Sequence, residues 1–185
     1  MTASLIRPAT VSDAPGIAHV HVESWRSTYP GMLPDRYLVG LSTATHEKRW
    51  RGLLTGAPPR GRRTFVASSA GRIVGFSSCG PQRTGLPGFG GEFYALYLID
   101  QAQGMGMGRR LLAAMAQHFL ALGTQAAMVW VLRENPSRYF YERLGGQLLA
   151  EQPISFAGTQ LMEVAYGWTD LVPLARLAAD PPVEG

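Results

Sequence analysis

The 185-residue chain contains a single cysteine, Cys79, and lacks any apolar run near the ~20 residues that a membrane-spanning helix needs. One cysteine cannot form an internal disulfide, which excludes a disulfide-stabilised secreted domain and favours a reducing compartment. Residues Met1 to Pro8 also lack a basic region followed by an apolar stretch, so no secretory signal is expected. These absences predict a cytoplasmic protein with no membrane partner.

Charged residues are scarce as well, at 16% of the chain against 46% hydrophobic residues, which excludes a disordered protein. The net charge of +4 comes mostly from scattered arginines. Their densest group, Arg60, Arg62 and Arg63, lies in a Pro/Gly-rich loop without interleaved aromatic residues. No nucleic-acid partner is therefore expected. The positive net charge is also compatible with a small polyanionic ligand. The four histidines have no ligand spacing with cysteine or carboxylates, so no metal site is expected.

Hydrophobic periodicity divides the chain into short strands and helices. Strand patterns cover about 5–7, 64–68, 73–79, 93–99, 126–132, 147–156 and 160–166, and helical patterns cover about 12–28, 35–41, 45–54, 109–122 and 135–144. Hairpin strands followed by strands that alternate with helices predict an α+β fold, with a central, mostly antiparallel mixed sheet of six to seven strands flanked by about four helices. No repeat or linker divides the sequence. We therefore expect residues 1–185 to form one domain, with a flexible connection at 80–91, a short helix after Trp168, and a loose tail at 172–185.

The segment Gln103 to Gly108 reads Gln-Gly-Met-Gly-Met-Gly and lies between a predicted strand and a predicted helix. Glycines allow the backbone to approach a ligand closely, and the first turn of a helix leaves amide N–H groups without intrahelical partners. The helix dipole adds roughly half a positive charge at the same end. A strand, a glycine-dense turn and a helix in this order therefore predict a site for a phosphate or diphosphate.

Two common glycine loops do not fit this segment. A nucleoside triphosphatase loop would end in Gly-Lys-Ser or Gly-Lys-Thr, but Arg109 follows the last glycine. The dinucleotide pattern Gly-x-Gly-x-x-Gly fails because its third glycine would fall on an arginine or a leucine. The pattern that fits is Gln-x-x-Gly-x-Gly, formed by Gln103, Gly106 and Gly108; for these six residues alone, a plain glycine-rich turn remains the alternative.

This pattern resembles the acyl-coenzyme A loop, Gln/Arg-x-x-Gly-x-Gly/Ala, of the GCN5-related N-acetyltransferase (GNAT) superfamily. Two further segments are similar to that superfamily: Asn-x₃-Tyr-Phe-Tyr-Glu-Arg-Leu-Gly-Gly at 135–146 and Trp-x₃-Tyr-x-Gly-x-Leu-Pro at 25–34. The order of predicted elements is similar to the GNAT fold from Ile6 to about Leu171. The resemblance implies an N-acetyltransferase that uses acetyl-CoA as co-substrate, needs no metal, and acetylates a primary amine of a small molecule or protein by direct attack.

The resemblance also assigns the groups that hold the cofactor. Backbone N–H groups of the loop would bind the diphosphate, and the loop residues are Gln103, Gly104, Met105, Gly106, Met107, Gly108 and Arg109. A bulge or splay near Leu98 would open the sheet for the pantetheine arm, with the Leu98 N–H directed at the thioester oxygen. Asn135 would cap its helix and could also contact the cofactor arm.

Catalytic roles are implied for two residues. Tyr141 is the expected general acid for the leaving thiolate, with an aromatic core position as the alternative. Glu92 is the candidate base, with an exposed strand-end acid as the alternative. Trp25 and Tyr29 are expected to contact the acceptor amine, although core packing would also explain Trp25. A non-catalytic acyl-CoA-binding module on the same fold is the rival function, and the acceptor and a homodimer are left open.

Overall fold

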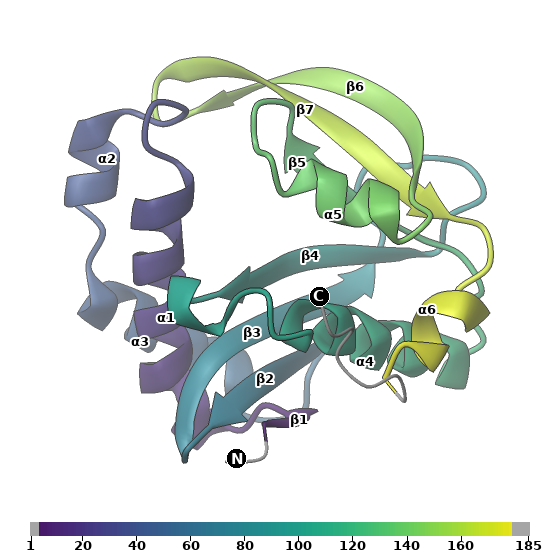
Figure 1. Cartoon of the computed structure of the whole chain (residues 1–185), viewed down its shortest axis with the longest axis horizontal. Coiled ribbons are helices and arrows are strands. Elements are labelled where there is room, and N and C mark those ends of the chain that lie inside the picture. The colour runs from purple at the N-terminus through teal and green to yellow at the C-terminus, as the bar shows by residue number, and fades with distance from the viewer. Residues whose placement is uncertain (1–3, 179–185) are drawn as a thin grey trace.

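The computed structural model describes residues 4–178 and arranges them around one twisted sheet, in the order β1-β2-β3-β4-β5-β7-β6 (Figure 1). Of the strand pairs, β4 and β5 are parallel and the others are antiparallel, so the predicted mostly antiparallel mixed sheet is confirmed. The strands are β1 (Leu5–Pro8), β2 (Arg63–Ser69), β3 (Arg72–Pro81), β4 (Gly91–Leu98), β5 (Ala127–Leu132), β6 (Gln147–Phe156) and β7 (Thr159–Trp168).

Helices cover both faces of the sheet (Figure 1). They are α1 (Ala14–Thr28), α2 (Asp35–Val39), α3 (Thr43–Leu54), α4 (Met107–Ala121), α5 (Arg138–Arg143) and α6 (Val172–Arg176), with 3₁₀ turns η1 (Val11–Asp13) and η2 (Asp100–Ala102). Because successive side chains of a strand point to opposite faces, Phe65 of β2 joins the core under α4, whereas Val66 joins the core under α1 and α3.

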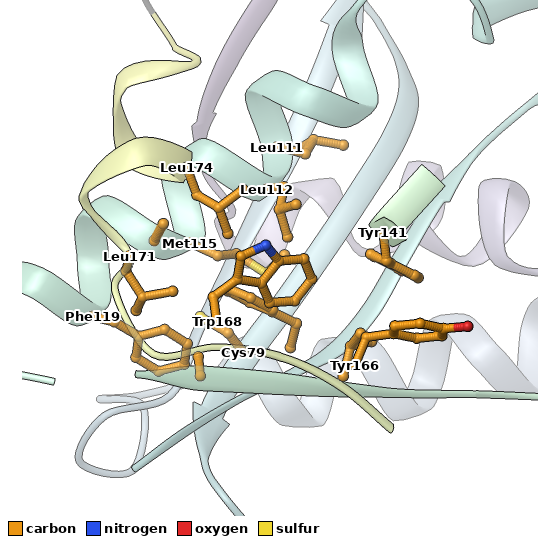
Figure 2. Packing of buried hydrophobic residues seen from close by; sticks show 14 of the residues in the cluster. Cys79, Leu111, Leu112, Met115, Phe119, Tyr141, Tyr166, Trp168, Leu171 and Leu174 are labelled. Atoms are coloured by element: carbon orange, nitrogen blue, oxygen red, sulfur yellow. The ribbon is translucent and has the colours of Figure 1, made fainter. Parts of the chain in front are cut away.

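The larger core lies between α4, α6 and the sheet (Figure 2). Leu111, Leu112, Met115 and Phe119 form one stripe of α4, and Trp168, Leu171 and Leu174 pack against the same region. The stretch that the sequence assigned to a loose tail, 172–185, therefore begins with the packed helix α6, whose Leu174 is 1% exposed. The part of that predicted tail from 179 onward lies outside the described residues.

Two helix starts differ from the sequence pattern. Helix α4 begins at Met107, before the predicted Arg109, because Gly106 takes the left-handed conformation (φ 74°) that ends the turn early. Helix α5 begins at Arg138, after the predicted start at Asn135. There the Asn135 Oδ1 accepts the N–H of Ser137 at 2.9 Å, so the side chain caps a turn ahead of the helix.

Candidate active site

Strands β4 and β5 pair over a short length and then separate. Their parallel register covers Gly91, Glu92 and Phe93 of β4, and no residue after Phe93 pairs with β5 in the described chain. At this point β4 has a bulge: Phe93 lies opposite Cys79 and Ala95 lies opposite Ser78, which leaves Tyr94 as the extra residue. The predicted opening in the sheet is therefore present, but it begins at Tyr94, four residues before the expected position near Leu98.

The open edge of β4 directs backbone groups into this gap. The Ile99 N–H donates to the Val74 carbonyl of β3 at 3.0 Å, so Ile99 faces β3. Because backbone groups of successive strand residues point to alternate sides, the N–H groups of Leu98 and Leu96 point away from β3 and toward β5. The Leu98 carbonyl on the same side accepts hydrogen bonds from side chains, Ser24 Oγ at 3.2 Å and Gln103 Nε2 at 3.3 Å.

The glycine-rich loop follows directly at the end of β4. Gly104 and Gly106 both have left-handed φ angles, 73° and 74°, which L side chains adopt only with strain. The first intrahelical bond of α4 runs from the Arg110 N–H to the Gly106 carbonyl at 3.1 Å. The amide groups of Gly106, Met107 and Gly108 precede it and have no intrahelical acceptor, so the loop presents N–H donors at a helix N-terminus. The Gln103 N–H, which was also expected to face the ligand, instead donates to the Asp100 carbonyl at 3.1 Å.

The loop and the gap belong to one cavity of about 730 Å³. Most residues that the sequence assigned to the site line it, namely Trp25, Tyr29, Leu98, Gln103, Gly104, Gly106, Gly108, Arg109, Asn135 and Tyr141. The structure does not place Met105, Met107 or Glu92 among its lining residues. Met107 is buried in the core, so it can offer a ligand its backbone alone, whereas the Met105 side chain is exposed outside the cavity lining.

The basic side chains of the cavity come from the two helices beside the glycine loop. Arg109 of α4 and Arg143 of α5 both line it, and their charge suits a polyanionic ligand. The neighbouring Arg110 turns away: its guanidinium donates to the hydroxyl of Ser4 at 2.9 Å and to the Ser4 carbonyl at 3.2 Å. Arg110 therefore ties α4 to the start of β1.

Tyr141 reaches the cavity from α5 and is 7% exposed. Its ring packs between Phe140, at 5.3 Å, and Trp168, at 6.2 Å, so the core contact and the cavity position coexist. Within residues 4–178 its hydroxyl makes no hydrogen bond, and burial raises its pKa above the usual tyrosine range. The hydroxyl thus stays protonated at neutral and moderately alkaline pH.

Tyr29 and Asn135 meet in the same cavity. The Tyr29 hydroxyl lies 3.0 Å from the Tyr97 hydroxyl. Burial raises the pKa of Tyr29, and hydrogen bonds with Tyr97 and Asn135 oppose that rise. Trp25, one turn before Tyr29, packs edge-on against its ring at 5.0 Å and lines the cavity, so Trp25 contributes to packing and to the cavity wall.

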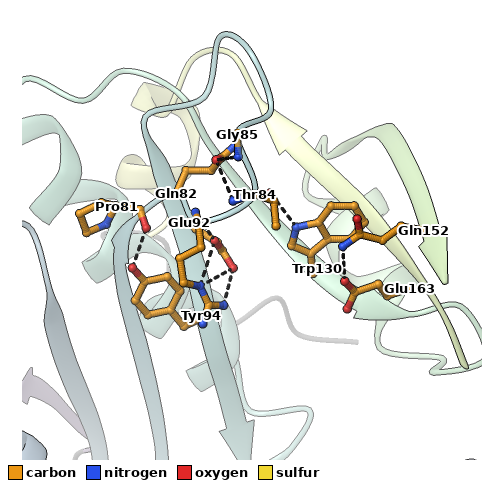
Figure 3. A network of polar contacts seen from close by, with 10 residues as sticks. Pro81, Gln82, Thr84, Gly85, Glu92, Tyr94, Trp130, Gln152 and Glu163 are labelled. Carbon is orange, nitrogen blue, oxygen red and sulfur yellow. Dashed lines mark hydrogen bonds and ion pairs between the residues drawn. The ribbon is translucent and has the colours of Figure 1, made fainter. Parts of the chain in front are cut away.

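Glu92 is placed differently from the other predicted residues (Figure 3). Its side chain is 1% exposed, and its carboxylate accepts from the guanidinium of Arg83, with Nη2 to Oε1 at 2.5 Å, and from the Arg83 N–H at 3.0 Å. Gln82, through its side-chain oxygen, accepts the N–H groups of Thr84 and Gly85. The segment 80–91, expected as a flexible connection, is thus held by its own hydrogen bonds and by Glu92.

The sequence missed several residues that line the cavity, among them Tyr94, Trp130, Phe156 and Glu163. They come from four different strands and meet through long-range pairing, which local patterns do not report. One signal was present: Glu163 is an acid within the otherwise apolar run from Leu161 to Val164.

Comparisons with known proteins agree with this geometry. A family model described as FR47-like protein matches residues 86–154, which include the β4–β5 gap and the glycine loop. The chain is 40% identical over 174 residues to the uncharacterized N-acetyltransferase YuaI of Bacillus subtilis, covering 93% of this chain and 96% of that protein. Among solved structures, a protein described as "a putative acetyltransferase of the GNAT family" from Desulfovibrio desulfuricans matches with a TM-score of 0.69 at 19% identity, covering 92% of this chain and 100% of that one. YncA of Salmonella typhimurium, solved with its cofactor acetyl-CoA, matches with a TM-score of 0.66 at 18% identity, covering 92% and 95%.

The chain belongs to the GCN5-related N-acetyltransferase superfamily, as the likeness to YuaI over nearly the full length of both chains shows. The likenesses to solved structures support the same fold. Across residues 4–178, the structure has no helix with the length and apolar character needed to cross a membrane. The same described residues contain no group of three or more His, Cys, Asp or Glu side chains that could hold a metal ion.

Proposed function

We propose that this chain transfers the acetyl group of acetyl-CoA to the primary amine of a small molecule or protein by direct attack. The observation that carries the proposal is the junction of two features in one cavity. A glycine loop presents helix N-terminal amides, and an unpaired edge of β4 begins beside it. Each feature suits one part of the same co-substrate, the diphosphate and the extended pantetheine arm.

The residues present fit acetyl-CoA on three counts. The N–H groups around Gly106 to Gly108 and the charge of Arg109 suit the diphosphate. The backbone groups of Leu96 and Leu98 can pair with the amides of pantetheine as a further strand would. Gly108 faces Leu98 and Phe140 without a side chain, which keeps the space between the loop and α5 clear.

When bound, acetyl-CoA supplies the acetyl group and a thiolate that leaves as the amine nitrogen bonds to the carbonyl carbon. In this arrangement the Leu98 N–H donates to the carbonyl oxygen as negative charge develops on it. Tyr141 gives its phenolic proton to the leaving sulfur. The burial that raises the pKa of Tyr141 also raises the basicity of a thiolate in the same cavity, because low polarity disfavours both anions.

The proton lost by the amine needs an acceptor other than Tyr141. Glu92, the predicted base, is engaged by Arg83, so its action as a base requires that ion pair to open. We propose instead that Glu92 holds the 82–90 loop in place and that the amine proton leaves through water in the open cavity. The whole chain acts as one acyltransferase domain in the cytoplasm in this proposal.

Release of free thiol from acetyl-CoA, followed with a panel of primary amines, tests the function. The proposal predicts saturable turnover with at least one amine and none without an amine. Tight coenzyme A binding without turnover on any amine would instead support a binding module that lacks catalysis.

A further inference from the structure

One face of the β5-β7-β6 part of the sheet forms a wall of the cavity. Leu132 lies opposite Glu163, and Glu163 lies opposite Gln152, so these three side chains share a face. Positions two residues away on each strand point to the same face. The cavity-lining members of this face, which we call the acceptor wall, are Trp130, Leu132, Ile154, Phe156, Leu161 and Glu163.

Glu163 gives the acceptor wall its one charge and is the one acidic residue among the described residues that line the cavity. Its Oε1 accepts a hydrogen bond from the neutral amide of Gln152 at 2.7 Å (Figure 3). No basic side chain of residues 4–178 lies within ion-pair distance of this carboxylate. The charge of Glu163 contributes to the raised pKa of Arg83 from beyond that distance, while the Arg83 guanidinium is bound by Glu92. The basic residues of the cavity, Arg109 and Arg143, belong to α4 and α5. A half-buried carboxylate with a neutral partner attracts a cation from the ligand.

The surroundings of Glu163 suit a cation with an apolar body. Trp130 is fixed by a hydrogen bond from its Nε1 to the Thr84 hydroxyl at 3.2 Å (Figure 3). Trp25 and Phe156 also line the cavity, with their rings 5.9 Å apart. Aromatic faces bind both ammonium groups and apolar carbon, and the rest of the wall is aliphatic. These side chains offer no cation to a second, anionic group on the acceptor.

The same contacts limit the size of the acceptor. Phe156, next to the end of the β6–β7 hairpin, packs against Trp25 of α1 and, at 5.1 Å, against Tyr37 of α2. This bridge joins the hairpin to the first two helices across the acceptor side of the cavity. A small molecule fits such a site better than an extended peptide does.

We propose that Glu163 binds the ammonium group of the acceptor, and that the acceptors are small primary amines with an apolar or aromatic body and no carboxylate beside the amine. The inference rests on the proposed acetyltransferase function. An amino acid would bring its own carboxylate close to Glu163, where like charges repel, and the nearby guanidinium of Arg83 is already bound by Glu92. The Glu163 carboxylate thus selects among acceptors in two ways, because it attracts the ammonium group and repels a carboxylate beside it.

Three ligands of matched shape test this inference: phenethylamine, phenylalanine and phenylalanine amide. The wild type should acetylate phenethylamine and the amide with kcat/KM values at least ~10-fold above that of phenylalanine. Glu163→Gln should raise the KM for phenethylamine by about 10- to 100-fold, the effect of one lost charge-assisted contact, and shrink the preference over phenylalanine. Its affinity for coenzyme A should stay that of the wild type. The matched control is Glu151→Gln, an exposed acid of β6 outside the cavity, which should change none of these values.

Calorimetric titration of phenethylamine into the coenzyme A complex measures recognition apart from turnover. If phenethylamine binds the wild type and binds Glu163→Gln more weakly, the inference is supported even when no amine is acetylated. An absence of acetylation would remove the catalytic function alone. Equal or better use of phenylalanine, an unchanged KM in Glu163→Gln, or preference for a peptide amino terminus would overturn the inference and leave the acetyltransferase function standing.

Discussion

Gly108→Asp should weaken coenzyme A binding, whereas Gly108→Ala, which places a residue that the loop pattern also allows at this position, should not. Gly108 is the second residue of α4 and has no left-handed φ. A Cβ added there would lie 3.5 Å from Leu98 Cδ1 and 3.6 Å from the Phe140 ring, which are ordinary van der Waals distances. Alanine therefore fits, and because alanine costs less chain entropy than glycine in a helix, the free energy of unfolding should rise by about 0.5–1 kcal/mol.

An aspartate carboxylate would extend from the same Cβ into the space beside the loop amides, Leu98 and Phe140. We assign this space to the approach of the diphosphate, which a carboxylate would repel. The loss of one charge-assisted hydrogen bond costs roughly 1.5–3 kcal/mol, which corresponds to about 10- to 150-fold weaker binding.

Isothermal titration with coenzyme A and urea unfolding of the same preparations measure the two effects separately. Gly52→Asp is the matched control, because Gly52 lies within α3, where an added Cβ meets nothing within 4 Å. It should bind coenzyme A as the wild type does. Wild-type affinity in Gly108→Asp would refute the diphosphate placement, and an equal loss in both aspartate variants would show that the effect is not local.

Three further predictions concern other buried groups. Tyr141→Phe should lower kcat by about 100-fold or more, because the thiolate loses its proton donor, while KM for acetyl-CoA changes little; unchanged turnover would remove the acid assignment. Glu92→Gln should cost about 1–3 kcal/mol of unfolding free energy, since Arg83 loses a charged partner, and should leave kcat nearly unchanged; a large kcat loss with an altered pH profile would instead support Glu92 as the base. Burial, with the nearby charges of His46 and Arg49, lowers the pKa of His21 to about 3. Between about pH 6.5 and about pH 3, His21 of the unfolded chain therefore binds a proton that His21 of the folded chain does not. The free energy of unfolding should therefore fall with decreasing pH across this range, by up to about 1.4 kcal/mol per pH unit from His21. Urea unfolding of His21→Gln at several pH values should show a smaller dependence of this free energy on pH.

The glycine loop could be predicted from the sequence because its geometry is local. The left-handed φ angles of Gly104 and Gly106 and the unpaired amides of a helix start depend on residues that are neighbours in the chain. The order of strands and helices was likewise readable from periodicity. The start of α4 at Met107 differed by two residues, because the pattern of apolar residues does not report where a left-handed glycine ends a turn.

The acceptor side could not be predicted in the same way. Glu163 and Trp130 belong to β7 and β5, and Tyr94 is placed by a bulge in β4. Their meeting depends on strand register across the sheet, which no local pattern contains. Glu92 shows the same limit: the sequence left it as a base or an exposed strand-end acid, but in the structure it is buried and paired with Arg83, which comes from a loop that the sequence presented as flexible.

The location of bound coenzyme A tests the central claim most directly. A crystal structure of the complex should show the diphosphate within hydrogen-bond distance of amides between Gln103 and Arg109, with the pantetheine arm between β4 and β5. A diphosphate bound elsewhere on the protein, or a pantetheine arm outside the β4–β5 gap, would contradict the account.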